Sequence, residues 1–228
     1  MSFVFAPNAT PSVPIAGRSE LFPVHRIYCV GRNYADHAKE MGGAVERGTP
    51  MFFMKPADAI VTGGADVPYP GATSDLHHEV EMVVAIGRSG RDIAQENALN
   101  HVFGYAVGLD LTRRDLQAAA KSKGHPWDTA KGFDASAPIS ELHRAEDSGH
   151  PTHARLSLEI NGSIRQDSDI AEMIFSVPDI IVALSTFFEL QAGDLIYTGT
   201  PAGVASLQRG DRFRAQLGGV AELTGRIV

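Results

Sequence analysis

The sequence is organised around one stretch, Leu76-His77-His78-Glu79-Val80-Glu81-Met82-Val83-Val84-Ala85-Ile86-Gly87. Apolar and polar side chains alternate through its first half, which is the period of a β-strand. Successive side chains on a strand point to opposite faces, so Glu79 and Glu81 are expected to share one face. Two neighbouring carboxylates repel each other unless a positive charge lies between them. The pair therefore indicates a site for Mg²⁺ or Mn²⁺, with a strand that has one polar, solvent-facing edge as the simpler alternative.

The composition limits the classes of function. The chain has 228 residues with a formal net charge of −7, which argues against a nucleic-acid-binding surface. Its single cysteine, Cys29, cannot form an internal disulfide, so a reducing compartment is expected. The first residues lack the pattern of a signal peptide, and no apolar run is long enough to cross a bilayer. These features predict a cytoplasmic protein that binds neither nucleic acid nor membrane.

The pattern of apolar runs and turn residues predicts an α+β domain. Prolines mark residues 1–24 as an extended arm, and residues 25–228 are expected to form a single catalytic domain. Strands are expected at 27–30, 51–54, 102–109, 156–160 and 195–198 and within 76–87, with a hairpin turn at Asn161-Gly162. Helices are expected at 34–41 with Asn33 as N-cap, 93–100, 112–123 with a Thr112/Asp115 capping box, and 176–188. The segments 42–50, 127–133 and 141–155 are expected to be loops, the first of them mobile.

Several short motifs occur in a fixed order along this chain. They are Tyr28-Cys29-Val30-Gly31-Arg32-Asn33-Tyr34, His37-x-x-Glu40, Phe53-x-Lys55-Pro56, His78-Glu79-x-Glu81, Gly108-Leu109-Asp110, Thr112-x-Arg114-Asp115-x-Gln117, Lys131-x-Phe133-Asp134 and Gly193-Asp194-x-Ile196-x-Thr198-Gly199-Thr200-Pro201-x-Gly203-Val204. Together they resemble the fumarylacetoacetate hydrolase family from Tyr28 to the C-terminus. The segments 110–117 and 187–191 are most similar to its acylpyruvate hydrolases. One departure is Ala205, where relatives often have a glycine.

The resemblance implies a fold and a set of site residues. The fold would be a mixed β-sheet roll with a few peripheral helices, usually forming a homodimer. One Mg²⁺ or Mn²⁺ per subunit would be bound by Glu79, Glu81 and Asp110. Lys131 would lie in the active site, and the pair His37–Glu40 would lie on a segment that orders over the substrate.

The resemblance also implies the reaction, which is hydrolysis of the C3–C4 bond of a 2,4-dioxo acid. Fumarylpyruvate is the expected substrate, split to fumarate and pyruvate in gentisate-type aromatic catabolism. The His37–Glu40 pair is expected to take a proton from water, and Lys131 to fix the substrate oxygens. The residues expected to orient the substrate are Arg32, Asn33, Lys55, Arg114, Gln117 and Thr200. For a distal carboxylate, Arg32, Lys55, Arg113 and Lys123 all remain candidates.

Other functions are compatible with the same residues. A metal-dependent oxaloacetate decarboxylase or a 2-hydroxyhepta-2,4-diene-1,7-dioate isomerase would keep the metal ligands and change the reaction. A non-catalytic dicarboxylate-binding protein would keep only the fold. His77 and His78 have no cysteine or histidine cluster at the spacing of a zinc site, so they are not expected to bind zinc. Cys29 is followed by no base at the spacing of a catalytic pair, so it is not expected to act as a nucleophile.

Overall fold

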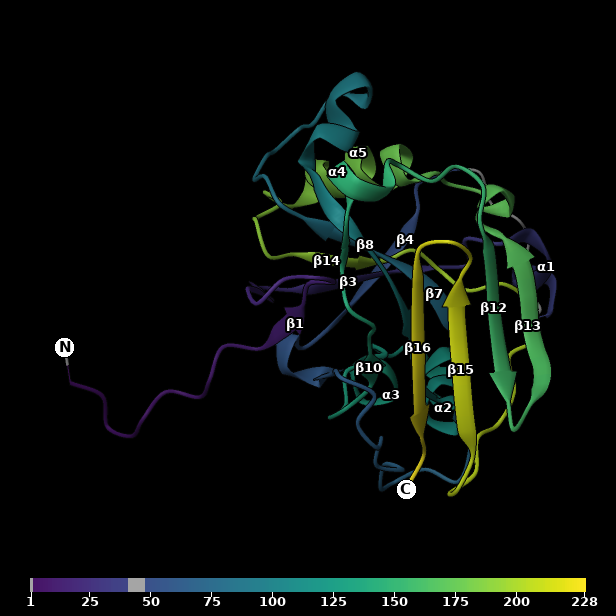
Figure 1. Ribbon diagram of the computed structural model, residues 1–228. Coiled ribbons are helices and arrows are strands. Elements are labelled where there is room, and N and C mark those ends of the chain that lie inside the picture. The colour runs from purple at the N-terminus through teal and green to yellow at the C-terminus, as the bar shows by residue number, and fades with distance from the viewer. Residues whose placement is uncertain (1, 41–47) are drawn as a thin grey trace.

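The computed structural model describes residues 2–40 and 48–228, and its largest sheet has six strands (Figure 1). In spatial order these are β11 (His143–Arg144), β8 (Val102–Leu109), β7 (Val80–Ile86), β14 (Leu195–Tyr197), β3 (Ile27–Gly31) and β4 (Met51–Lys55). The β14–β3 pair is parallel and the other pairs are antiparallel, so the sheet is mixed.

The central strand β7 is buried on both faces. Val80, Met82 and Val84 belong to one apolar cluster, whereas Val83 and Ala85 belong to a second cluster on the opposite face. The alternation of the sequence is therefore real, but its polar positions do not form a solvent-facing edge. Glu79 and Glu81 are only 5% and 1% exposed. Their burial excludes the alternative of a strand with one polar, solvent-facing edge. Burial of two carboxylates is costly unless positive charges accompany them.

A four-stranded antiparallel sheet lies beside the first (Figure 1). Its strands in spatial order are β13 (Ser163–Asp169), β12 (Arg155–Ile160), β15 (Arg212–Leu217) and β16 (Ala221–Arg226). The predicted hairpin is confirmed: β12 and β13 pair through Asn161-Gly162, both with positive φ (52° and 78°), as a tight hairpin turn requires. Two further short pairs are β10 (Ala137–Pro138) with β5 (Ile60–Val61), and β6 (Leu76–His77) with β9 (Thr112–Arg113).

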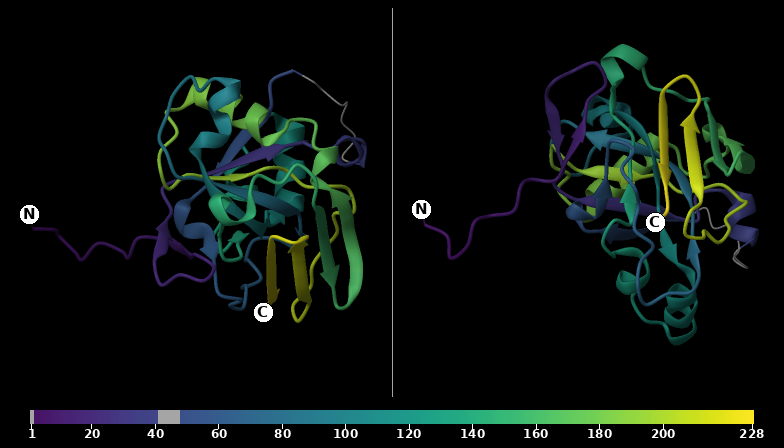
Figure 2. Two further views of the ribbon diagram at one scale, coloured as in Figure 1. Left: turned by 45° about the horizontal axis from the view of Figure 1, so that its top comes forward. Right: turned by 60° about the horizontal axis from the view of Figure 1, so that its bottom comes forward.

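The helices are few and peripheral, in agreement with the predicted α+β class (Figures 1 and 2). They are α1 (Ala35–Glu40), α2 (Arg114–Lys123), α3 (Asp128–Lys131), α4 (Ala145–Ser148) and α5 (Val177–Phe187), with 3₁₀ turns at Ala57–Ala59, Gln95–His101 and Ile170–Glu172. Helix α5 begins with a full capping box in which Ser176 and Asp179 satisfy each other's backbone amides. None of the helices within the described ranges is long and apolar enough to span a membrane.

Some local expectations are corrected. Thr112 does not cap a helix, because it pairs with His77 in the β6–β9 ladder and its hydroxyl donates to the Asp110 carbonyl; α2 begins at Arg114 instead. The carboxylate of Asp115 binds the Thr73 hydroxyl. The expected loops 127–133 and 141–155 contain α3, β11 and α4, and the expected helix 93–100 is a 3₁₀ helix.

The N-terminal arm is shorter than expected. Ser12–Pro14 (β1) pairs with Leu21–Pro23 (β2), and Val13 and Phe22 are buried against the six-stranded sheet. Proline is tolerated on such short edge strands, which explains why a proline-rich stretch still packs. Residues 2–10 are all exposed and extend away from the body (Figures 1 and 2). The expected mobility of 42–50, and the end of the helix at Met41, fall mostly outside the described residues.

Candidate metal centre and active site

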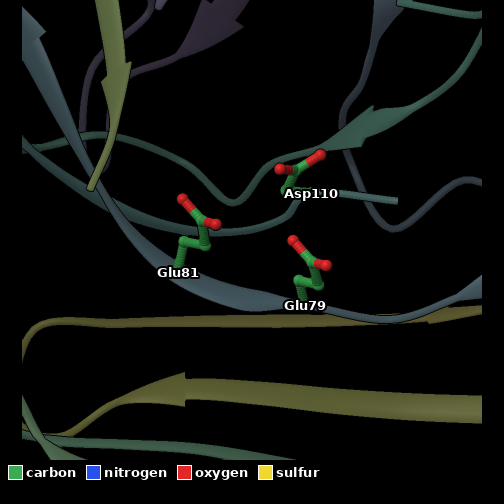
Figure 3. Close-up of side chains that lie close together, drawn as sticks. All are labelled: Glu79, Glu81 and Asp110. Atoms are coloured by element: carbon green, nitrogen blue, oxygen red, sulfur yellow. The ribbon is translucent and has the colours of Figure 1, made fainter. Parts of the chain in front are cut away.

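Three acidic side chains meet where β7 begins and β8 ends (Figure 3). Glu79 directly precedes β7, Glu81 is its second residue, and Asp110 directly follows β8. The antiparallel register pairs Glu81 with Gly108, and the amide of Asp110 donates to the carbonyl of Glu79 at 2.8 Å. The two neighbouring strands thus bring the three carboxylates together, with one oxygen of each within 4.8 Å of the others.

Lysine and arginine side chains contact these carboxylates. The Nζ of Lys131 donates to Glu79 Oε2 at 2.8 Å and to Asp110 Oδ2 at 2.6 Å. The Nζ of Lys55 lies 2.9 Å from Asp110 Oδ1, and the guanidinium of Arg114 pairs with Glu79 Oε1. Both lysines are 2% exposed. Such buried charges are tolerated because each has a partner of opposite sign.

The surroundings shift the pKa values of this group in different directions. Burial raises the pKa of Glu81, and the carboxylates of Asp110 and Glu79 raise it further, well above its usual range. Burial also acts to raise the pKa of Glu79, but the charges of Lys131 and Arg114 outweigh it and hold that pKa well below its usual range. Burial acts to lower the pKa of Lys131, yet Asp110 and Glu79 raise it to about 12. A cation bound beside Glu81 would stabilise the ionised form of its carboxylate.

The donor set fits a hard divalent cation. The group offers carboxylate oxygens and no imidazole or thiolate, which suits Mg²⁺ or Mn²⁺ better than zinc. Three carboxylates and the three cations Lys55, Arg114 and Lys131 sum to a formal charge of zero, so a bound dication would make the site positive. A positive, partly enclosed site attracts an anionic ligand.

A histidine–glutamate pair on α1 faces the same site. Its members, three positions apart, are joined by a contact of 3.3 Å between His37 Nδ1 and Glu40 Oε2. Both oxygens of Glu40 accept from the amide of Gly203 at 3.2 Å. Burial lowers the pKa of His37, against the opposing effect of Glu79 and Glu40. With Nδ1–H directed to Glu40, the neutral ring keeps Nε2 free to accept a proton.

The turn that anchors Glu40 depends on a glycine. Gly203 has φ of +98°, and a Cβ there would lie 2.2 Å from the carbonyl oxygen of Arg165. At the departure from the family pattern, the carbonyl of Ala205 accepts from the amide of His78 at 3.2 Å, without a positive φ. An alanine therefore fits the local backbone.

One cavity connects these groups. Nine of the predicted site residues line it: Arg32, His37, Glu79, Glu81, Asp110, Arg114, Gln117, Lys131 and Thr200. Glu40 lies outside the lining and contacts it through His37. Arg114 donates to the side-chain oxygen of Gln117, so two of the expected substrate-orienting groups hold each other in place.

Two of the expected substrate-binding residues do not line the cavity. The side-chain amide of Asn33 donates to the carbonyls of Phe175 and Thr198, and its oxygen accepts from the amide of Phe175. These bonds also leave Asn33 no part as an N-cap of α1. Lys55 donates to the carbonyls of Leu111 and Lys131 in addition to its pairing with Asp110. Both residues therefore hold backbone segments next to the cavity and do not form its lining.

Sequence reasoning missed several residues of the site. Gln166 on β13 donates to Thr200 Oγ1 and to the carbonyl of Pro201, and its oxygen contacts His78. Nothing in the pattern of β13 distinguishes this buried glutamine from its exposed neighbours. Lys121 also lines the cavity, together with the apolar residues Val30, Met51, Phe53 and Trp127. The signal for Lys121 was present, because it lies four residues after Gln117 and seven after Arg114 on one helix face.

Comparisons with known proteins place the chain in one family. Residues 26–228 match the family described as fumarylacetoacetate (FAA) hydrolase C-terminal. The chain is 42% identical to oxaloacetate tautomerase YcgM of Escherichia coli, over 91% of this chain and 94% of that protein. It is 41% identical to the human mitochondrial oxaloacetate tautomerase FAHD1, over 88% and 90% of the two chains.

A solved structure matches over the whole chain. It is fumarylpyruvate hydrolase from Pseudomonas aeruginosa in complex with Mn²⁺ and pyruvate, with a TM-score of 0.97 and 50% identity over 100% of this chain and 99% of that one. The expected family and mixed-sheet fold are confirmed by these matches. The protein is an enzyme of the fumarylacetoacetate hydrolase family.

Proposed function

We propose that this enzyme hydrolyses the C3–C4 bond of a 2,4-dioxo acid, with fumarylpyruvate as the substrate and fumarate and pyruvate as products. The observation that carries the proposal is the presence, around one cavity, of a buried three-carboxylate site, a lysine and a supported histidine. The full-length likeness to a fumarylpyruvate hydrolase adds to it.

The residues of this chain can supply each part of the reaction. Neutral His37 takes a proton from water at Nε2, and Glu40 stabilises the resulting imidazolium through Nδ1–H. The hydroxide adds to C4, the C3–C4 bond breaks, and its electron pair passes to the pyruvate fragment, which then takes up a proton at C3. A divalent cation bound by Glu79, Glu81 and Asp110 would supply Lewis-acid stabilisation of the negative oxygens.

The cationic side chains orient the substrate in this scheme. An ammonium group has three donors, and Lys131 uses two of them on Glu79 and Asp110. The third is available to a substrate oxygen in the cavity that Lys131 lines. Gln117, held by Arg114, offers its amide N–H groups to the same ligand. Thr200 is fixed by Gln166 and lines the same cavity.

The test is an assay of fumarylpyruvate cleavage with and without metal. We expect equal amounts of fumarate and pyruvate, loss of turnover with a chelator, and recovery with Mg²⁺ or Mn²⁺. Full activity of the metal-free protein would contradict the proposal, as would the absence of cleavage in metal-loaded protein.

The curated relatives favour a second candidate, oxaloacetate tautomerisation. Interconversion of enol and keto oxaloacetate needs a proton moved between carbon and oxygen, without addition of water, and the same carboxylate site can bind this diacid. Oxaloacetate decarboxylation and isomerisation of 2-hydroxyhepta-2,4-diene-1,7-dioate are further variants on the site. The discriminating measurement is a panel of fumarylpyruvate, acetylpyruvate and oxaloacetate, in which enol decay, carbon dioxide and pyruvate are followed separately.

Three further features belong to the proposal. The metal is Mg²⁺ or Mn²⁺, and the Mn²⁺ bound in the Pseudomonas structure supports Mn²⁺. The enzyme is a homodimer, which sedimentation velocity tests. It acts on its small-molecule substrate in the cytoplasm, where a reducing environment suits its buried, unpaired Cys29.

A further inference from the structure

The open end of the cavity carries two cations that the proposed chemistry does not use. Arg32 and Lys121 both line it, and neither forms an ion pair with an acidic residue among residues 2–40 and 48–228. Burial lowers the pKa of Lys121, and the nearby charges of Arg32 and Arg114 lower it further. Like charges held this close to one another are stabilised when an anion lies between them.

Helix α2 sets the position of Lys121 relative to the metal centre. Arg114, Gln117 and Lys121 follow one another at spacings of three and four residues, so they lie on one face of the helix, along the cavity. Arg114 contacts Glu79 at the inner end. Lys121 lies seven residues further on, about 10 Å along the helix at 1.5 Å per residue.

The backbone at Arg32 is unusual. Its φ of 59° is in the left-handed region, which residues other than glycine rarely adopt. Residues kept in such conformations cluster at ligand sites, where the backbone directs a side chain to a particular place. Here it follows directly after β3 and places Arg32 in the cavity lining.

The wall between the two ends is apolar. Phe53 and Trp127 line the cavity and pack against each other with ring centroids 5.9 Å apart, and Met51 lies beside them in the lining. An apolar wall with charged groups at both ends suits a hydrocarbon chain that carries an anionic group at each terminus.

We propose that Lys121, together with Arg32, binds a second carboxylate at the far end of the substrate, so that the enzyme prefers dicarboxylic acylpyruvates. This inference rests on the proposed function and assigns its acyl group. We expect the seven-carbon diacid fumarylpyruvate to reach Lys121 from the carboxylate triad, because its two carboxylates lie at opposite ends of the chain. Acetylpyruvate lacks the second carboxylate, and the four-carbon chain of oxaloacetate is expected to end short of Lys121.

The earlier candidates for this role are engaged elsewhere or lie outside the cavity. Lys55 is held by Asp110 and two carbonyls. Arg113 donates to the carbonyl of Thr129 and lies over the ring of Phe133. Lys123 is exposed and outside the lining, although it is only two residues from Lys121 on the same helix. It is therefore a matched control.

The experiment compares Lys121→Met, Lys121→Arg and Lys123→Met in metal-loaded enzyme, with fumarylpyruvate and acetylpyruvate as substrates. For Lys121→Met we expect KM for fumarylpyruvate to rise about 10- to 100-fold, the range for loss of a hydrogen bond to a charged group. We expect kcat/KM for acetylpyruvate to change less than about twofold, since that substrate makes no contact with Lys121. Lys121→Arg keeps the charge and should retain the preference, and Lys123→Met should match the wild type.

A loss of the same size for both substrates, or no change for either, would overturn the subsite. Failure of the proposed function is a separate outcome, in which the wild type cleaves neither acylpyruvate. The subsite is then decided by calorimetric binding of 2-oxoheptanedioate and 2-oxoheptanoate, which have equal length and differ in the distal carboxylate. We expect the diacid to bind more tightly to the wild type and the difference to vanish in Lys121→Met. Equal affinities for the wild type would overturn the inference.

Discussion

The floor and the rim of the cavity are built in opposite ways. The floor, formed by Glu79, Glu81, Asp110 and Lys131, is 0–5% exposed, and each member is held by charge-assisted hydrogen bonds or a backbone amide. The rim, formed by Arg32, His37, Glu40 and Lys121, is more open: Glu40 and Lys121 are exposed and Arg32 is half-buried. His37 is buried, but its contact with Glu40 is longer, at 3.3 Å.

This difference separates two tasks. A buried, fully paired floor keeps its charges in place before any ligand arrives, which is what stabilisation of developing charge requires. A rim with exposed and weakly paired side chains can adjust to the ligand and be changed without loss of the fold. Changes in the floor should therefore affect metal binding, stability and turnover together, whereas changes in the rim should affect rate or specificity alone.

The largest effect is expected from Glu81→Gln. The amide still accepts from the Gly199 N–H, so the fold should be retained, but one of the three anionic ligands is lost. Turnover should fall roughly 10⁴-fold, equivalent to about 5.4 kcal/mol, and calorimetric titration should show greatly weakened metal binding. Glu96→Gln, at an exposed position, is the control. Metal affinity and turnover like those of the wild type would remove Glu81 from the site.

Lys131→Met tests whether the floor depends on paired charges. Removal of one partner from a buried ion-pair group costs about 3–5 kcal/mol. We expect that loss in the free energy of unfolding, measured by denaturant titration in the presence of a chelator. A divalent cation should restore part of it, because it supplies positive charge beside Glu79 and Asp110. The exposed Lys39→Met, which breaks only a surface pair, should change stability little. Unchanged stability of the metal-free Lys131→Met variant would mean that the floor does not need this charge.

The floor was also the more predictable region, and the reason is physical. Strand period is a local property, so the shared face of Glu79 and Glu81 follows from the alternation of polar and apolar residues between His77 and Val84. Asp110 joins them through the register of β7 and β8, which the sequence alone does not specify, and the family resemblance supplied it.

Residues that act through long-range contacts were harder to place. Asn33 and Lys55 were expected to contact the substrate, but their side chains bind backbone carbonyls outside the cavity lining. A sequence motif does not show whether a residue lines a cavity or holds the backbone next to it. Gln166 reaches the site from the second sheet, at a sequence distance of 34 residues from Thr200. The expected cap at Thr112 failed because pairing with β6 outweighed a local helix signal.

Glu40→Gln tests the rim. The amide oxygen can still accept from Gly203, but it no longer stabilises a protonated His37. We expect kcat to fall about 100-fold, at the low end of the range for general acid–base catalysis, with metal affinity unchanged. Glu40 acts to raise the pKa of His37, so its neutralisation should lower that pKa and move the acid limb of the pH–rate profile to lower pH. An unaffected rate and an unmoved acid limb would exclude Glu40 from catalysis.

A substitution outside both the floor and the rim shows how much a loss of stability alone affects the enzyme. Ser176→Ala removes the cap of α5, which lies away from the cavity, and should cost about 1 kcal/mol of unfolding free energy without affecting kcat.

Burial acts to raise the pKa of Asp179, but hydrogen bonds from Ser176 and Gln95 lower it overall. Its contribution to stability is therefore present above the pKa of the unfolded state and is lost as the pH falls through the lower, folded value. The difference in stability between wild type and Ser176→Ala should narrow over that acid range, with the exposed Ser19→Ala as control. A loss of kcat in Ser176→Ala comparable to that of Glu40→Gln would mean that the rim responds to general destabilisation, and the division between floor and rim would fail.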